Sequence, residues 1–170
     1  MTRAARSWTA AAVLLIAAAC GGGGVATPSP SRPGPHLGTT DGCPPSFWAK
    51  PENFQRWEEL RPDAVVGVFF PEPEQYAEMT LADALQATSA SDVRRVLIQQ
   101  AIAAMLNAAH ESLDYPYSRY ELGVDGRPPI VPTVADLLQT GTEDQMAAFA
   151  RELREANELG CRLELIPTPP

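Results

Sequence analysis

Apolar residues recur at three- and four-residue steps along the centre of the chain, which is the spacing of one face of an α-helix. A first stripe consists of Val93, Val96, Leu97, Ala101, Ala104, Met105 and Ala108. A second stripe consists of Ile98, Ile102 and Leu106. A helix that is apolar around much of its girth belongs in the middle of a bundle. We therefore predict a central helix that starts after an N-cap at Ser91 and runs to about Leu113.

Start and stop signals on either side of this segment predict four shorter helices. Their expected ranges are 51–60, 80–87, 133–138 and 142–159. The expected N-cap residues of the last three are Thr80, Thr133 and Thr142. Thr142 pairs with Gln145 in a capping-box pattern, and Thr80 pairs with Asp83 in the same pattern with Asp in place of Glu. The apolar run 65–70 lies between prolines and predicts either a short strand or a buried loop.

Proline and glycine set the connections between these elements. Pro44 and Pro45 predict an extended entry into the domain, and Gly141 is expected to end the helix before it. The region 43–165 has roughly 120 residues, which is enough for one domain with one core. The predicted fold class is mainly α, a small helical bundle with irregular Pro-rich connections, followed by a frayed tail at 166–170.

The first residues have the layout of a secretory signal peptide. Arg3 and Arg6 give a positive start, and an apolar run from Trp8 to Ala19 follows. This run is about twelve residues long, well short of the roughly 20 that a membrane-spanning helix needs. We therefore predict that residues 1–19 export the chain and are then removed.

The segment 14–20, Leu-Leu-Ile-Ala-Ala-Ala-Cys, resembles the end of a bacterial lipoprotein leader, although that family usually has Leu where Ala17 stands. The resemblance implies that Cys20 receives lipid and anchors the chain to the cell membrane. Ordinary cleavage after Ala19 is the alternative, and it would release a secreted protein. Residues 20–42 are mostly Gly, Pro, Ser and Thr with little to bury, which predicts a disordered tether.

Cys43 and Cys161 remain once Cys20 is assigned to lipid, and they stand at the two ends of the domain. In an exported protein such a pair predicts a disulfide. Closing a loop of this size would stabilise the fold by roughly 4 to 5 kcal/mol in the chain-entropy model. The sequence has no paired Cys-x-x-Cys spacing of the kind found in zinc and redox sites, so we expect no metal ion and no cofactor.

The charge of the chain bears on its partners. With 13 basic and 21 acidic residues, the formal net charge is −8. A surface this acidic repels phosphate backbones, so nucleic acid is not an expected partner. The charge also argues against direct docking on anionic lipid heads, which leaves lipid on Cys20 as the expected contact with the membrane.

Four short motifs carry a resemblance to a known family. The domain opens Cys-Pro-Pro-Ser-Phe-Trp at 43–48, and its centre reads Leu-Asn-Ala-Ala-His at 106–110. Tyr-Pro-Tyr follows at 115–117, and Asn-Glu-Leu-Gly-Cys closes the domain at 157–161. In order and spacing these motifs resemble the secreted bacterial domain that opens Cys-Thr-Pro-Gly-Tyr-Trp-Lys-Asn-His and closes Asn-x-Leu-Gly-Cys. The family's Lys-Asn-His falls on 49–51, which here reads Ala-Lys-Pro, so no role of that tripeptide carries over.

The resemblance implies an exported or surface-attached domain for which no catalytic activity is established. Aromatic residues near the motifs supply a candidate ligand-binding site. They are Phe47, Trp48, Phe54, Trp57, Tyr115, Tyr117 and Tyr120. Together they could form a platform for a sugar or a peptide, with Lys50 and Glu111 at its rim. The alternative is that they pack the two ends of the domain beside the disulfide.

His110 lies near the end of the predicted central helix and is a candidate general base or ligand. A histidine in the last turn also interacts well with the negative end of the helix, which is a structural role. Asn107, one turn earlier, is expected to cap the helix or to join a buried polar network with Tyr115 or Tyr117.

The sequence contains no nucleophile elbow, phosphate-binding loop or zinc-protease motif, so we assign no catalytic residue. The expected function is that of an exported, lipid-anchored cell-envelope protein whose domain has a binding or structural role. The first alternative is a glycan- or cell-wall-binding module that uses the aromatic platform. The second is a hydrolase centred on His110. A cell-envelope glycan or protein is the expected partner beyond the membrane.

Overall fold

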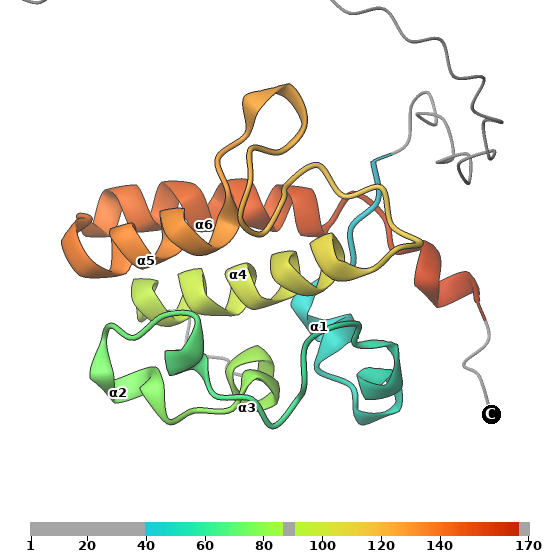
Figure 1. Ribbon diagram of the computed structural model, residues 1–170, viewed down its shortest axis with the longest axis horizontal. Coiled ribbons are helices and arrows are strands. Elements are labelled where there is room, and N and C mark those ends of the chain that lie inside the picture. The colour runs from blue at the N-terminus through green and yellow to red at the C-terminus, as the bar shows by residue number, and fades with distance from the viewer. Residues whose placement is uncertain (1–39, 87–90, 167–170) are drawn as a thin grey trace, which may run out of the picture. The chain divides into compact units, whose positions relative to one another are not determined.

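The computed structural model describes residues 40–86 and 91–166, which belong to the compact unit Leu37–Pro170. This part is mainly helical, with irregular connections between its helices (Figure 1). The α-helices are α1 (Pro45–Trp48), α2 (Glu74–Ala77), α3 (Leu81–Gln86), α4 (Val93–Ala109), α5 (Ile130–Thr140) and α6 (Glu143–Asn157). The 3-10 helices are η1 (Pro51–Arg56), η2 (Val66–Val68), η3 (Val124–Gly126) and η4 (Arg162–Leu165). A disulfide joins Cys43 to Cys161, so the predicted fold class is confirmed.

Helix α4 forms the centre of the bundle, as its all-round apolar pattern predicts. In Figure 1 it runs between the pair α5 and α6 on one side and α1, α2 and α3 on the other. It packs most extensively on α6 and also contacts α5, α3 and α1. Ala101, Ala103 and Ala104 are fully buried, and their small side chains let the neighbouring helices approach closely.

Both ends of α4 differ from the prediction. The N-cap is Asp92 instead of Ser91, because its carboxylate accepts hydrogen bonds from the backbone N–H groups of Arg94 and Arg95. The helix ends at Ala109, and His110 leaves it with an extended backbone at φ −77° and ψ 115°. The expected continuation to Leu113 is therefore wrong.

Helices α5 and α6 are joined by a tight turn at Gly141. The capping box of α6 is confirmed, since Thr142 accepts from the backbone of Gln145 and the Gln145 side chain accepts from the backbone of Thr142. Thr133 is not an N-cap, because α5 already begins at Ile130. The first N–H groups of α5 instead donate to backbone carbonyls of the preceding loop, as in the 3.0 Å bond from Ile130 to Ser118.

The N-terminal third of the domain contains shorter pieces than predicted. The segment from Pro45 is a one-turn helix, where an extended entry was expected, since proline fits the first turn of a helix. The helix expected over 51–60 is the 3-10 helix η1, which ends at Arg56. The run 65–70 is a partly buried turn around η2, with Val66 and Phe70 in the core and Val68 71% exposed, and one isolated bridge joins Val65 to Thr80.

Several predictions concern residues outside the described ranges. The signal peptide 1–19, the lipid on Cys20 and most of the tether 20–42 are among them, as are residues 167–170 of the predicted tail. Within the described ranges, no helix is both long and apolar enough to cross a membrane.

Candidate functional site

The two ends of the domain meet at the disulfide between Cys43 and Cys161, whose Cα atoms are 4.4 Å apart. Beside it, the N–H of Gly42 donates to the carbonyl of Gly160 at 3.1 Å. Arg162 forms an ion pair with Asp41 at 2.6 Å, between its Nη2 and the carboxylate Oδ2. A side chain at Gly42 would overlap the backbone carbonyl of Ala156, so this close approach requires glycine.

A buried polar network lies directly behind this closure. The Oδ1 atom of Asn107 accepts from the backbone N–H of Cys43 at 2.9 Å and from Nε1 of Trp48 at 3.0 Å. Its Nδ2 group donates to the carbonyl of Cys43 and to Oδ1 of Asn157, both at 2.9 Å. The Asn107 side chain thus bonds both the N–H and the carbonyl of Cys43, the two backbone groups that a neighbouring β-strand would pair with.

Asn157 is the second centre of the network, and both asparagines are fully buried. Its Oδ1 atom also accepts from the Tyr115 hydroxyl at 2.7 Å, and its Nδ2 group donates to the backbone and the side chain of Gln100. Burial raises the pKa of Tyr115 well above its ordinary value, so the phenol keeps the proton that it donates. The expected link between Asn107 and Tyr115 is therefore present, and it passes through Asn157.

The aromatic residues proposed for ligand binding lie mostly in the core. Trp48, Trp57, Tyr115 and Tyr117 have exposed fractions of 0, 9, 8 and 4%. Trp48 packs beside the disulfide network, and the Tyr117 ring meets Phe149 at 6.3 Å in an edge-to-face contact. These side chains form no exposed platform, and their placement matches the alternative in which they pack the ends of the domain. Tyr120 is the exception, with 58% of its surface exposed.

His110 is enclosed by protein groups at the C-terminal end of α4. Its side chain is 9% exposed, and its ring lies 6.1 Å from that of Trp48. Its Nδ1 atom accepts from the backbone N–H of Ser112 at 3.2 Å, and Nε2 lies 3.6 Å from a Glu58 carboxylate oxygen. Burial lowers the pKa of His110, and the negative charge of Glu58 partly opposes this shift. This arrangement suits a neutral packing residue at a helix end better than an open general base.

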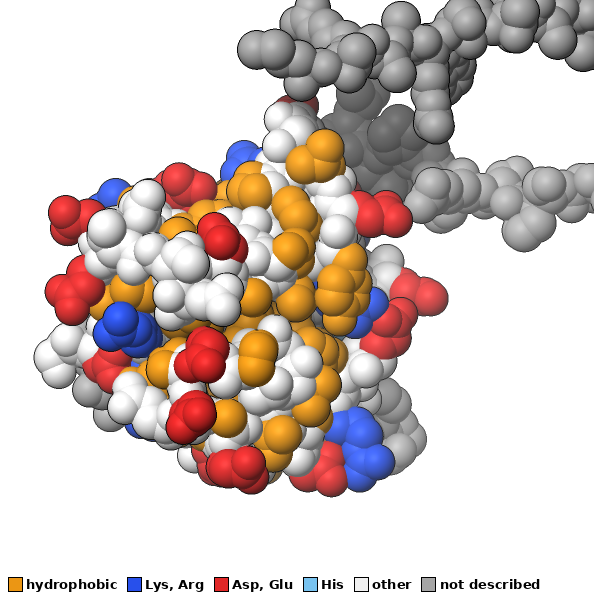
Figure 2. All heavy atoms as spheres, turned by 60° about the vertical axis from the view of Figure 1, so that its left-hand side comes forward, with side chains coloured by type: hydrophobic (Ala, Val, Ile, Leu, Met, Phe, Trp, Pro, Cys, Tyr) orange, Lys and Arg blue, Asp and Glu red, His pale blue; other side chains and the backbone are white. Residues whose placement is uncertain are grey.

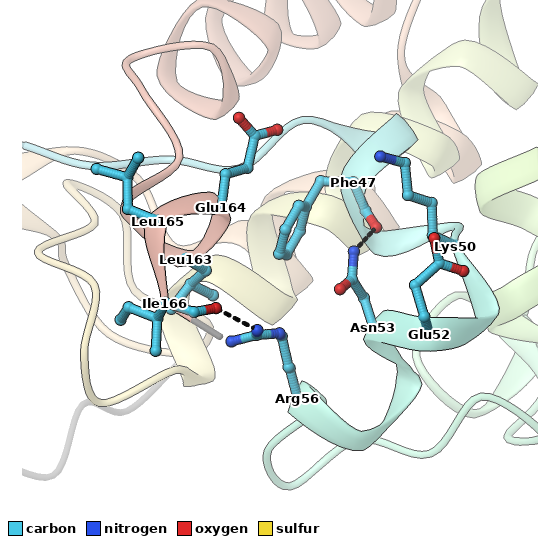
Figure 3. A pocket seen from close by; sticks show the side chains of 9 residues that line it. All are labelled: Phe47, Lys50, Glu52, Asn53, Arg56, Leu163, Glu164, Leu165 and Ile166. Carbon is cyan, nitrogen blue, oxygen red and sulfur yellow. Dashed lines mark hydrogen bonds between the residues drawn. The ribbon is translucent and has the colours of Figure 1, made fainter. Parts of the chain in front are cut away.

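A groove of about 620 Å³ lies between η1 and η4, close to the disulfide (Figure 3). In Figure 3 the charged ends of Lys50 and Glu164 lie on either side of the Phe47 ring. Arg56 donates to the carbonyl of Ile166 at 2.7 Å, and Asn53 donates to the carbonyl of Phe47 at 2.7 Å. The groove is lined by side chains of both signs of charge and by polar groups, a mixture that suits a polar, hydrogen-bonding ligand.

Acidic residues outnumber basic ones in the chain, 21 to 13. Figure 2 shows them around the edges of one face, with hydrophobic side chains across its centre and basic side chains in small separate groups. In residues 40–86 and 91–166, no group of three His, Cys, Asp or Glu side chains is placed to hold a metal ion.

The sequence interpretation missed Asn157 and Gln100 as site residues, and of the groove lining it named only Phe47 and Lys50, as parts of the aromatic platform. A signal for Asn157 was present, since it lies four residues after Leu153 on the apolar stripe of its helix. A polar residue on a buried stripe needs hydrogen-bond partners, and here it has them. The groove carried no such signal, because it depends on how η4 folds back against η1.

Comparisons of this chain with protein-family models, with curated proteins and with solved structures give no match.

Proposed function

We propose that this chain is an exported protein, held at the cell membrane by lipid on Cys20, that displays a non-catalytic helical domain in the cell envelope. The observation that carries the proposal is the closure of the domain by a disulfide at the point where the tether joins it. Disulfides persist in oxidising compartments outside the cytosol, which agrees with an N-terminal export signal.

A non-catalytic role is supported by where the reactive side chains are used. Asn107 and Tyr115 are used in the buried network behind the disulfide, and the His110 ring accepts from the Ser112 backbone beside Glu58. The groove between η1 and η4 is accessible to a ligand, with the exposed residues Lys50 and Glu164. We assign binding of an envelope peptide or glycan to this groove.

Fractionation of cells that express the full chain tests the anchor. The wild-type protein should sediment with membranes and pass into the detergent phase, because acyl chains contribute about 0.8 kcal/mol per buried CH₂. The Cys20→Ser variant should appear in the extracytoplasmic soluble fraction or keep its uncleaved leader. A wild-type protein that is released and begins at residue 20 without added mass would contradict the anchor and favour ordinary cleavage.

Binding of envelope fragments to the folded domain tests the groove. Purified peptidoglycan fragments should shift the NMR signals of Lys50 and Glu164, and a Lys50→Glu variant should lose the shift of Glu164. Lys50 is exposed, so the variant should keep the fold. Arg61→Glu is the matched control, since it reverses an exposed charge whose partner is Asp63, outside the groove. Equal losses in both variants would contradict the assignment.

A further inference from the structure

The loop 119–127, here called the apolar loop, stands out from the bundle between α4 and α5 (Figure 1). Tyr120, Leu122 and Val124 have exposed fractions of 58, 71 and 54%. They alternate with Glu121 and Gly123 along the chain. Single exposed apolar side chains are normal on a protein surface, but several in one projecting loop mark an interaction site.

Specific contacts hold this loop in its projecting shape. The N–H of Gly123 donates to the carbonyl of Arg127 at 2.8 Å, and that of Val124 donates to the carbonyl of Pro116 at 3.0 Å. The Arg127 guanidinium lies 5.0 Å from the centre of the Tyr117 ring. A Cβ atom at Gly123 would lie 2.5 Å from the Pro116 carbonyl oxygen. The exposure of the apolar side chains is therefore built into the fold.

The base of the apolar loop adjoins the point where the tether enters the domain. A hollow of about 280 Å³ is lined by Thr40, by Pro116 and Arg127 at the base of the loop, and by the end of α6. The next residue, Asp41, donates its N–H to the carbonyl of Asp114 at 3.2 Å. The residues between Cys20 and Thr40 span at most about 65 Å when extended, so a lipid on Cys20 keeps this end of the domain within that distance of the bilayer.

The charges of the loop distinguish it from the acidic remainder of the domain. Arg119 and Arg127 balance Glu121 and Asp125, and Arg119 also pairs with Glu59. Aliphatic side chains together with tyrosine are the residues that partition into the interfacial layer of a bilayer. The loop can thus approach a lipid surface without the repulsion that the net charge of −8 causes for the whole chain.

We propose that the apolar loop is a second, non-covalent membrane contact, in which Tyr120, Leu122 and Val124 enter the interface of the bilayer that holds the Cys20 lipid. The inference rests on the proposed function, since the tether supplies the high local concentration that makes a weak contact effective. The contact would set how the bundle is oriented on the membrane.

The test places a fluorescent reporter in the loop of a tethered protein. The mature chain from Cys20, its other two cysteines paired, is coupled through the Cys20 thiol to a maleimide phospholipid in phosphatidylcholine vesicles. A Tyr120→Trp variant should show a blue-shifted emission and strong quenching by brominated lipid. The native Trp48 and Trp57 are buried and give a constant background. Val68→Trp is the control, because Val68 matches Leu122 at 71% exposure but lies in η2.

We expect quenching to be about threefold or more stronger for Tyr120→Trp than for Val68→Trp, since the interface retains apolar and aromatic side chains. Adding Leu122→Ser and Val124→Ser to the reporter variant should remove most of the difference. Equal quenching at the two positions would overturn the proposal. This is also the result expected if the loop binds a protein partner instead of the bilayer. Because the lipid is coupled chemically to Cys20, the quenching result does not depend on whether cells attach lipid there. The fractionation experiment tests that attachment.

Discussion

At the residue scale, the molecule depends on two buried asparagines that tie three segments together. Asn107 on α4 holds the backbone of Cys43, and Asn157 at the end of α6 links it to Tyr115. A buried amide whose four hydrogen-bonding positions are all used specifies one arrangement of its neighbours. The network therefore fixes the position of Cys43 opposite Cys161.

Removing the Asn107 side chain tests this role. Asn107→Ala should lower the free energy of unfolding by about 3 to 5 kcal/mol, because it leaves buried groups of Cys43, Trp48 and Asn157 without partners. Asn53→Ala is the control, since it removes a buried asparagine that makes one such bond, and its loss should be about 1 kcal/mol. Urea unfolding measures both, and similar losses would show that the network has no special weight.

The lowered pKa of His110 predicts a pH dependence of stability. A group whose pKa is lower in the folded state binds its proton more readily in the unfolded state. The contribution of His110 to stability should therefore be fully present above about pH 6.5, the ordinary pKa of histidine. It should be lost as the pH falls through the lower pKa that His110 has in the folded state. Unfolding experiments at about pH 7.5 and about pH 5.5 should show a smaller difference for His110→Gln than for the wild type. An unchanged difference would contradict the burial of a neutral ring.

Much of this residue-level chemistry could not be predicted from the sequence, and the reason is physical. The expectation that Asn107 joins a buried network was confirmed, because polar residues on an apolar helix need partners. Its partners come from positions 50 to 64 residues away in sequence, and local patterns do not encode such pairings. The aromatic residues were equally ambiguous, since a platform and a core use the same side chains.

At the element scale, helices with a clear cap or periodic pattern were predicted, including the short α3 after its Thr80 cap, and the four-residue helices α1 and α2 were not. The capping box at Thr142 and the two apolar stripes gave α6 and α4, because caps and periodicity act within a few residues. Helices α1 and α2 have four residues each, too few for a periodic pattern. Boundaries set by tertiary contacts, such as the start of α5 on the Ser118 carbonyl, were also missed.

The cap of α6 gives a prediction at this scale. Thr142→Ala should reduce stability by about 1 kcal/mol, because one backbone N–H of the first turn loses its acceptor. Thr140→Ala, on the other side of Gly141, should change stability by less than about 0.5 kcal/mol, since that hydroxyl bonds only within its own helix. Thermal unfolding distinguishes the two, and equal shifts would mean that the capping box contributes nothing of its own.

At the scale of the whole molecule, one covalent bond closes nearly the entire folded domain, with a sequence separation of 118 residues between its cysteines. The sequence predicted this pairing from the cysteine count and the export signal. It did not predict the groove, which arises where η1 and η4 meet, or the projecting shape of the apolar loop, which is held by backbone contacts to Pro116 and Arg127.

Loss of the disulfide should be the most damaging of the changes considered. The double variant Cys43→Ser, Cys161→Ser should have a free energy of unfolding about 4 to 5 kcal/mol lower than that of the wild type. Without the crosslink, the unfolded chain gains the conformational entropy of a long open loop. In protein prepared without the leader and without lipid, Cys20→Ser is the matched control, because it removes a thiol outside the closed loop and should leave the unfolding curve unchanged. A double variant as stable as this control would show that the bundle needs no covalent closure.

The most direct test is peptide mapping by mass spectrometry of the protein isolated from its own membranes, with and without reductant. The account predicts one linked peptide pair containing Cys43 and Cys161, which separates on reduction, and an N-terminal peptide that begins at an acylated Cys20. Free, alkylatable thiols at Cys43 and Cys161 in the unreduced protein would contradict it.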